Sequence, residues 1–221
     1  MADMLKVLSW NIKGANLETH LDSEESTKLQ RDWVCKILYS AYSSKQRDIH
    51  ILISKNLNVT IHKQLSDRKG RWVAISVDLM PAISVDLSVN RCSLINIYAP
   101  NPDSLDFFAD ICNVVKQIGN TYVIIGGDFN QVRDPALDKS NVANTRPIHK
   151  SQVAIDVLEE ELELVDIWRI LHPHILKKYT FYSKIHNSYS RIDHILLSNT
   201  LMKNIVDTNY LILFGWLILD F

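Results

Sequence analysis

The sequence has little of what marks a secreted or disulfide-rich protein. Its three cysteines, Cys35, Cys92 and Cys112, stand at unpaired spacings and form no Cys-x-x-Cys motif. Such cysteines are typical of reduced core thiols. The first eight residues, Met-Ala-Asp-Met-Leu-Lys-Val-Leu, lack the basic start and the apolar stretch of a signal peptide. We therefore expect an intracellular protein.

The chain also lacks an excess of charge of either sign and any long apolar run. Its 24 basic and 25 acidic residues give a formal net charge of −1. This near-neutrality excludes a broadly basic nucleic-acid binder, although it leaves room for a local basic grip on DNA. No run reaches the roughly 18–20 apolar residues of a membrane helix, so we expect no membrane partner.

What remains is an ordinary globular composition, with 47% hydrophobic and 22% charged residues in 221. This length predicts a single domain over 1–221, in which 199–221 is an atypical, largely apolar tail. Apolar residues recur at helical spacing over 23–36, 105–117 and 152–162, while 131–150 is polar and loop-like. Strand patterns occur over 5–12, 37–42, 49–54, 58–65, 71–79, 93–98, 123–125, 179–182 and 191–197. The alternation of strands and helices at both ends predicts an α/β sandwich with a mixed sheet.

One hexapeptide occurs twice. Ala-Ile-Ser-Val-Asp-Leu stands at 74–79 and again at 82–87, with Met80-Pro81 between the copies. A single repeat of six residues is too short for a solenoid. We interpret it as a tandem duplication within a hairpin, which would strain the local strand register.

The stretch from Thr121 to Asn130, Thr-Tyr-Val-Ile-Ile-Gly-Gly-Asp-Phe-Asn, carries the strongest functional pattern. A buried strand ends in two glycines, and Asp128 and Asn130 then stand two positions apart. At strand spacing these two side chains would leave the same face of a sheet. The alternative is an ordinary Asp-x-Asn turn after a strand.

Other polar residues follow further predicted strands, namely Asn11, Glu18, Tyr98, Thr180, Asp193 and His194. Cleavage of a phosphodiester needs a hard cation held by carboxylates, a base that deprotonates water, and donors for the charged transition state. The set supplies each of these types except an evident general base.

Five ordered motifs resemble those of the endonuclease/exonuclease/phosphatase superfamily, which includes exodeoxyribonuclease III and the apurinic/apyrimidinic endonucleases. They are Ser9-Trp-Asn-Ile12, Glu18-Thr-His20, Asn96-Ile-Tyr-Ala-Pro100, Gly126-Gly-Asp-Phe-Asn130 and Ser190-Arg-Ile-Asp-His194. Two more, Leu164-Val-Asp-Ile-Trp-Arg169 and Tyr179-Thr-Phe-Tyr-Ser183, resemble the endonuclease domain of vertebrate LINE-type retrotransposons. The similarity covers about residues 4 to 198.

The resemblance implies a DNase I-like fold, a four-layer α/β sandwich of two mixed β-sheets flanked by helices, here incomplete. It further implies a Mg²⁺-dependent endonuclease that also accepts Mn²⁺, acts on DNA in the nucleus, and exists as a monomer or as part of a longer retrotransposon polyprotein. An alternative placement in the same superfamily is a phosphatase of inositol lipids or sphingolipids.

Carried over residue by residue, the resemblance assigns roles to eight positions. Glu18 would be the main Mg²⁺ ligand with Asn11 beside it, and Asp193 would lie next to the metal. Tyr98 would hold the phosphate or the nucleophile, Asp128 would orient or activate the water, and Asn130 would support the transition state. Thr180 and Ser190 would contact the phosphate backbone.

Two departures from the family pattern bear on activity. Asn11 and Glu18 are only seven positions apart, whereas the helix and strand that separate these motifs in the family need about a dozen residues or more. The family's terminal Ser-Asp-His motif is also missing, because no histidine follows His194. We therefore expect an internally deleted, C-terminally truncated nuclease domain with impaired catalysis, or a non-catalytic remnant of one.

The remaining histidines and acids have structural interpretations. His194 would point away from Asp193 in an extended segment and pack on the sheet. His20, His50 and His62 share no metal-ligand spacing and are predicted to be surface or core residues. The run Glu159-Glu160-Glu161 is predicted to be a solvated helix face.

Overall fold

A computed structural model gives the fold of this protein. It describes residues 6–10, 34–43, 46–54, 59–79, 91–101, 104–141, 150–175, 177–204, 207–211 and 216–220. Asn11, Glu18, His20 and the second hexapeptide copy at 82–87 lie outside the described residues. The predictions made for them are therefore not tested by the structure.

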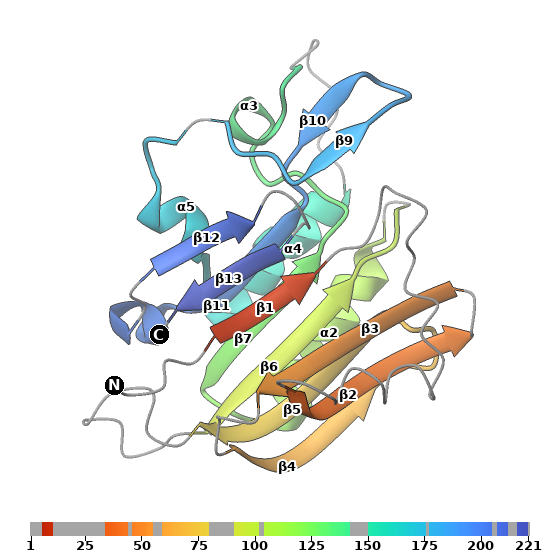
Figure 1. Ribbon diagram of the computed structural model, residues 1–221, viewed down its shortest axis with the longest axis vertical. Coiled ribbons are helices and arrows are strands. Elements are labelled where there is room, and N and C mark those ends of the chain that lie inside the picture. Colours follow the sequence, from red (N-terminus) through yellow and green to blue (C-terminus); the bar gives the residue numbers. More distant parts are fainter. Residues whose placement is uncertain are drawn as a thin grey trace.

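A six-stranded mixed sheet forms the centre of the molecule (Figure 1). Its strands lie in the order β4-β5-β6-β7-β11-β8, and only β6 and β7 run parallel to each other. The bounds are β4 Val59–Ser66, β5 Trp72–Leu79, β6 Arg91–Tyr98, β7 Tyr122–Asp128, β8 Leu164–Asp166 and β11 Asp193–Ser198. The first hexapeptide copy therefore lies in β5.

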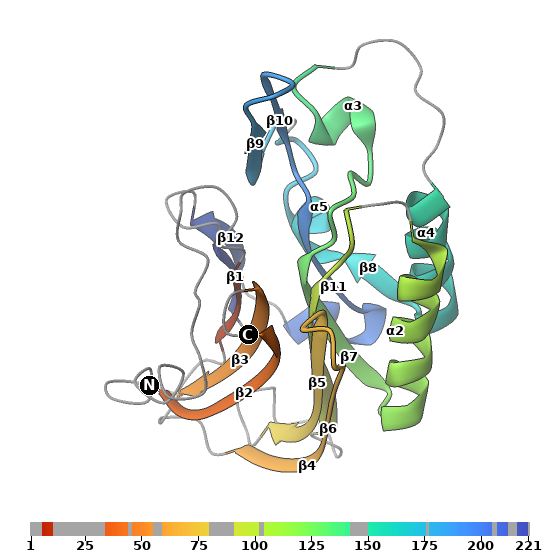
Figure 2. The same cartoon turned by 90° about the vertical axis from the view of Figure 1, so that its right-hand side faces the viewer.

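Two helices, α2 (Leu105–Ile118) and α4 (Lys150–Leu162), cover one face of this sheet (Figure 2). α2 is the crossover that parallel pairing of β6 and β7 requires. Its buried residues Phe108, Ile111 and Val115 recur at helical spacing and face the sheet. Gly119 ends the helix in a left-handed conformation with φ 78°. No helix among the described residues is both long and apolar enough to cross a membrane.

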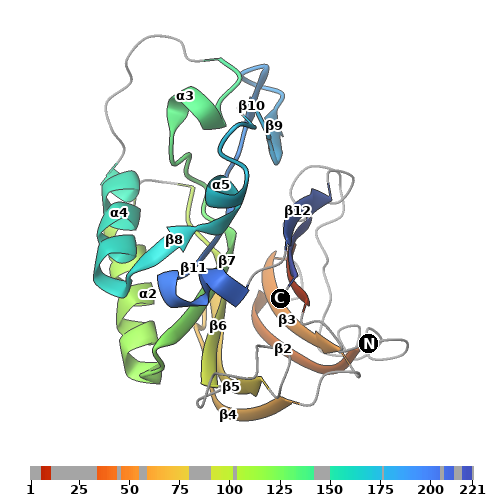
Figure 3. The same cartoon turned by 90° about the vertical axis from the view of Figure 1, so that its left-hand side faces the viewer.

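Two smaller antiparallel sheets cover the opposite face (Figures 2 and 3). One pairs β2 with β3, and the other has the order β1-β13-β12. β3 contacts β5 and β6, whereas β1 contacts β7 and β13 contacts β11. Their bounds are β1 Lys6–Trp10, β2 Val34–Ser43, β3 Gln46–Ser54, β12 Asp207–Leu211 and β13 Trp216–Asp220.

The hydrophobic core divides into two clusters, one on each face of the six-stranded sheet. Strand alternation sends Val123 and Ile125 of β7 towards the helices and Ile124 towards the smaller sheets. All three side chains are buried. A strand buried on both faces is a continuous apolar run, as the sequence pattern of β7 indicated.

Short elements gather beyond the end of β7 and the start of β11, around the top of the molecule in Figure 1. The hairpin of β9 and β10 lies directly before β11 in the chain. The bounds are α3 Pro135–Asp138, α5 Ile167–Leu171, β9 Phe181–Ser183 and β10 Ser188–Ser190, whereas the 3₁₀ helix η1, Asn199–Asn204, follows the opposite end of β11.

The predicted mixed sheet flanked by helices is confirmed, and a few local predictions are corrected. Val34 to Lys36, which were predicted to end a helix, belong to strand β2. The predicted loop 131–150 contains α3, which forms because the Asp134 side chain caps it by accepting from the Ala136 backbone N–H. Strand β10 was not predicted, and the apolar tail contributes β12 and β13.

Candidate active site

Strand β7 ends at a point where its backbone almost touches β6. Gly127 has φ 140°, and a Cβ atom built on it would lie 2.0 Å from the Ile97 carbonyl oxygen. No side chain fits there. The second glycine of the Gly-Gly-Asp motif is therefore needed for the close approach of the two strands that carry Tyr98 and Asp128.

Three of the predicted site residues form one row across neighbouring strands. Asp128 pairs in register with Tyr98 of parallel β6 and with Asp193 of antiparallel β11. Directly paired residues leave the same face of a sheet. That face carries Ile124 and is covered by the smaller sheets, where β1 contacts β7. Both carboxylates are buried, each with 3% of the residue exposed.

Asn130 reaches this row through a turn. β7 ends at Asp128, and Asn130 has a left-handed conformation with φ 50°. Its backbone N–H donates to Asp128 Oδ1 over 2.7 Å, and its Nδ2 donates to the Ala99 carbonyl over 2.6 Å. The prediction that Asp128 and Asn130 share a strand face is therefore wrong. The Asx turn brings them together instead.

Arg71, which the sequence analysis did not single out, also contacts this part of the site. The Arg71 guanidinium donates to the carbonyls of Tyr98 and Ala99 over 3.2 and 3.3 Å. It also lies 5.0 Å above the Tyr98 ring centre, within cation–π range. Arg71 and Asn130 thus converge on the same carbonyl of Ala99.

Thr180 and Ser190 lie beside the start of β11. Thr180 Oγ1 accepts from the backbone N–H groups of Ile192 and Asp193 over 3.1 and 3.3 Å. The Thr180 N–H donates to the Ser190 carbonyl over 2.9 Å. Thr180 therefore fixes the backbone that carries Asp193, a role that the resemblance did not assign to it.

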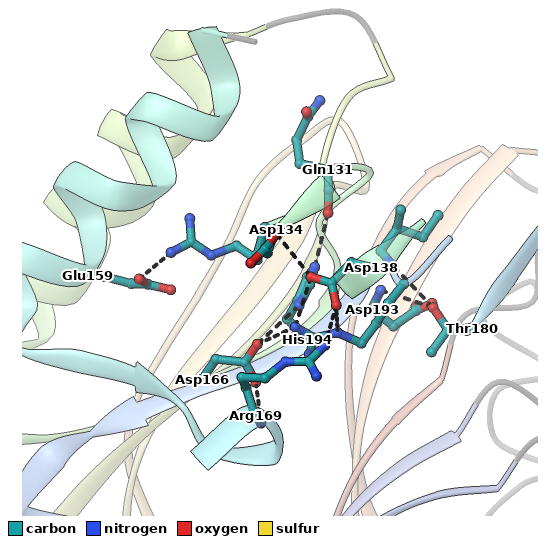
Figure 4. A network of polar contacts seen from close by, with 12 residues as sticks. Gln131, Asp134, Asp138, Glu159, Asp166, Arg169, Thr180, Asp193 and His194 are labelled. Atoms are coloured by element: carbon teal, nitrogen blue, oxygen red, sulfur yellow. Dashed lines mark hydrogen bonds and ion pairs between the residues drawn. The ribbon is translucent and has the colours of Figure 1, made fainter. Parts of the chain in front are cut away.

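A buried ionic cluster lies behind Asp193 (Figure 4). Arg191, only 1% exposed, donates to both carboxylate oxygens of Asp138 over 2.8 and 3.2 Å and to Asp166 over 2.6 Å. Arg169 adds a second cation to Asp138. Burial acts to raise the pKa of Asp138, but the hydrogen bonds and charge of Arg191 outweigh it and hold that pKa below its usual range.

His194 belongs to this cluster and faces away from the row. Its Nε2 donates to the Gln131 carbonyl over 3.0 Å, its Nδ1 lies 3.6 Å from Asp166, and its ring stands edge-on to Phe129. Burial, and then the charge of Arg191, lower the pKa of His194 despite the contact with Asp166. The prediction that His194 packs on the sheet, opposite in direction to Asp193, is confirmed.

No family model matches the chain. Solved structures match nearly all of it. An AP endonuclease, LMAP from Leishmania major, matches with TM-score 0.74 and 16% identity over 98% of this chain and 87% of its own. The 3'-5' exonuclease NExo from Neisseria meningitidis matches with TM-score 0.69 and 18% identity over 98% and 99%. The endonuclease domain of TRAS1, a telomere-specific non-LTR retrotransposon, matches with TM-score 0.61 and 15% identity over 97% of both chains.

This chain has the endonuclease/exonuclease/phosphatase fold. Identities of 15 to 18% show the fold alone. Within that fold, the row of Tyr98, Asp128 and Asp193 and the turn at Asn130 lie at one end of the six-stranded sheet. The motifs that suggested the superfamily thus converge in space where the structure describes them.

The donors at this end of the endonuclease/exonuclease/phosphatase fold suit a hard cation. Asp128 and Asp193 offer carboxylates on adjacent strands and Asn130 offers an amide, which are oxygen ligands of the kind that Mg²⁺ prefers. The described residues alone contain no group of three or more His, Cys, Asp or Glu side chains that could hold a metal. Glu18 and Asn11, the predicted metal ligands, lie outside the described residues, and the described strand β1 ends one residue before Asn11.

His50 and His62 lie on β3 and β4, strands that do not carry the row. His62 is exposed and contacts Asp78, and His50 is half-buried beside Tyr39. Among the three glutamates predicted to be solvated, Glu159 differs. It pairs with Arg133, and burial raises its pKa to about 7. It faces the loop after β7, and three consecutive glutamates in a sequence cannot indicate which of them makes such a contact.

Proposed function

We propose that this chain is a Mg²⁺-dependent phosphodiesterase domain of the endonuclease type that acts on DNA. The observation that carries the proposal is the register that aligns Tyr98, Asp128 and Asp193 across three adjacent strands. The shared fold supports it, because the solved structures with this fold include an AP endonuclease, an exonuclease and a retrotransposon endonuclease.

In the proposed mechanism, Asp128 orients the attacking water and takes its proton. The bond from the Asn130 N–H holds one oxygen of Asp128 and thereby sets the direction of the other. The water oxygen then bonds to phosphorus, and the ester bond breaks as the leaving oxygen takes the electron pair. Asn130 and the Tyr98 hydroxyl stabilise the charge on the phosphoryl oxygens.

A divalent cation would be held by Asp193 together with Glu18 and Asn11. When bound, it would polarise the phosphate and neutralise the developing charge. Two buried carboxylates on adjacent strands favour a cation between or beside them. Thr180 supports the cation's ligand by fixing the backbone at Asp193.

The β9–β10 hairpin provides a surface for DNA beside this site. The Tyr179 ring stacks on the Tyr189 ring with centres 5.9 Å apart, and the Tyr182 ring is tilted against Tyr189 with centres 4.7 Å apart. Tyr182 and Tyr189 are 41% and 50% exposed. Exposed aromatic rings beside hydroxyl groups, here those proposed to contact phosphate at Thr180 and Ser190, are typical of nucleic-acid contacts. A solved structure of the similar 3' phosphatase NExo from Neisseria contains a product DNA hairpin.

We also propose that catalysis is slow. His194 is fully buried, donates to the Gln131 carbonyl and contacts Asp166, so it cannot reach a phosphate on the opposite face of the sheet. His194 therefore cannot act as a catalytic base or as an electrostatic partner of the phosphate. Loss of such a group lowers reaction rates by about 10²–10⁴. The non-catalytic DNA-binding remnant is the limiting case of this proposal.

A plasmid-nicking assay tests the function. The purified chain is incubated with supercoiled DNA in Mg²⁺, Mn²⁺ or EDTA, beside Asp128→Ala and the exposed-carboxylate control Glu160→Ala. Slow nicking that needs a metal ion, survives in the control and disappears in Asp128→Ala is the expected result. DNA that is bound but never nicked would leave only the non-catalytic remnant. Absence of both nicking and DNA binding would reject the proposal.

A further inference from the structure

The β4–β5 turn, Asp67-Arg-Lys-Gly-Arg71, lies at the same end of the sheet as the site. It contains three basic residues and one acidic residue in five positions. Because β5 runs antiparallel to β6, its first residue, Trp72, pairs with Ile97 near the end of β6. The Tyr98 N–H donates to the Arg71 carbonyl over 2.7 Å, which connects the turn directly to the row.

Asp67 holds this turn in one shape. Its Oδ1 accepts from the backbone N–H groups of Arg71 and Trp72 over 2.7 and 3.2 Å and from the Ser40 hydroxyl over 3.0 Å. Gly70 supplies the left-handed conformation of the turn with φ 62°. A turn fixed in this way loses little conformational entropy when a ligand binds.

The basic side chains of the turn divide into two groups. Arg71 is half-buried and bonded to the Tyr98 and Ala99 carbonyls, whereas Arg68 and Lys69 are exposed. The carboxylate of Asp67 accepts from donors within the protein, whereas the exposed charged side chains of the turn are those of Arg68 and Lys69. Exposed cations on a rigid turn beside a phosphodiester site suit the phosphates of a DNA strand.

The turn and the β9–β10 hairpin flank the row on opposite sides. In the sheet order, β5 lies on the β6 side of β7, whereas β11, which follows the hairpin, lies on the other side. A duplex that contacts both flanks must pass over Tyr98, Asp128 and Asp193. This arrangement would centre one phosphate on the row.

We propose that Arg68 and Lys69 form a second phosphate-binding subsite for duplex DNA, on the turn before β5 and thus two β-strands along the sheet from Asp128 on β7. The inference rests on the proposed function and adds a binding surface that none of the sequence motifs contains. Arg71 connects the subsite to the row, because it bonds to the Tyr98 carbonyl and lies over the Tyr98 ring. The subsite reads backbone charge and not base sequence.

Binding of a labelled DNA duplex in EDTA, at a series of salt concentrations, tests the subsite without catalysis. The variant is Arg68→Gln with Lys69→Gln. The control is Arg91→Gln with Lys116→Gln, which removes the same charge at the opposite end of the sheet, where Arg91 begins β6 and Lys116 lies in the last turn of α2. Unchanged thermal unfolding of both proteins confirms their folds.

The expected result is a loss of affinity of about tenfold or more at low salt in the variant, with little change in the control. The magnitude of the negative slope of log K against log salt should fall by about two, since each phosphate contact contributes roughly 0.9 to it. The charge-retaining pair Arg68→Lys with Lys69→Arg should bind like the unmodified chain. Equal binding by variant and control would overturn the subsite while leaving the proposed function intact. Failure of the unmodified chain to bind DNA would overturn the subsite, and it would reject the proposed function only together with an absence of nicking.

Discussion

At the residue scale, the site depends on backbone geometry as much as on the side chains that would do chemistry. Asp128 and Tyr98 meet because Gly127 lets β7 lie against the Ile97 carbonyl. Asn130 joins them because it adopts a left-handed conformation that few residues tolerate, asparagine among them. Neither the glycine nor the asparagine is interchangeable with a larger residue of similar polarity.

Gly127→Ala is predicted to destabilise the fold by about 3 kcal/mol or more, because its Cβ would overlap backbone atoms that cannot move aside. Gly119→Ala is the matched control. Gly119 also has a positive φ, but its nearest neighbour would lie 3.8 Å from the new Cβ, so a loss of about 1 kcal/mol is expected. Urea unfolding of both variants measures the difference, and similar losses would contradict the role given to the β6–β7 approach.

At the scale of elements, Arg191, which lies just before β11, joins the start of this strand to α3 and to β8. Its guanidinium binds Asp138 at the end of α3 and Asp166 at the end of β8. Asp166 also caps α5 by accepting from the Arg169 N–H. Ion pairs of Arg191 with buried or partly buried carboxylates therefore hold the start of β11, and with it Asp193.

Arg191→Met is predicted to lower the free energy of unfolding by about 3–5 kcal/mol, since it leaves two buried carboxylates without their shared cation. Arg169→Met should cost less, because that side chain is 19% exposed and Arg191 still pairs with Asp138. Chemical denaturation at neutral pH tests the ranking. The reverse order would show that Arg191 is not the centre of the cluster.

Glu159 gives the contact between α4 and the loop after β7 a pH dependence. Its pKa is about 7 in the folded chain, against 4.5 for the unfolded group, because burial outweighs the charge of Arg133. Between these two values only the folded state holds the proton, so stability falls as pH rises from about 4.5 to 7. Glu159→Gln should remove this slope. Thermal unfolding from pH 4.5 to 8 checks the prediction, and parallel curves for the two proteins would contradict it.

At the scale of the whole molecule, the sequence was sufficient where local pattern and fold agree. The apolar run of β7 and the helical spacing of α2 predicted buried elements that the structure contains. Contacts distant in the sequence could not be predicted. Arg191 and Asp138 are 53 positions apart, and nothing local marks them as partners. The sequence left Asn130 either on a strand face or in an Asp-x-Asn turn, because a pattern of alternate residues does not reveal where the strand ends; the structure has the turn.

Mg²⁺ is predicted to stabilise the whole fold by binding the folded chain alone. At a concentration of 100 times Kd the gain is about 2.7 kcal/mol, a rise in Tm of about 5–10 °C for a chain of this size. EDTA should reverse it, and Asp193→Asn should abolish it. Differential scanning fluorimetry without DNA measures both. A rise of equal size in Asp193→Asn would remove Asp193 from the ligand set.

The chain order of β6, β7 and β11 sets the order in which the members of the row are synthesised. Tyr98 and Asp128 are 128 − 98 = 30 positions apart, and both belong to one strand–helix–strand unit with α2 between them. Asp193 follows 193 − 128 = 65 positions later and pairs across an antiparallel boundary. The first two members of the row are therefore translated well before the third, and the full row needs β11 to pair with β7.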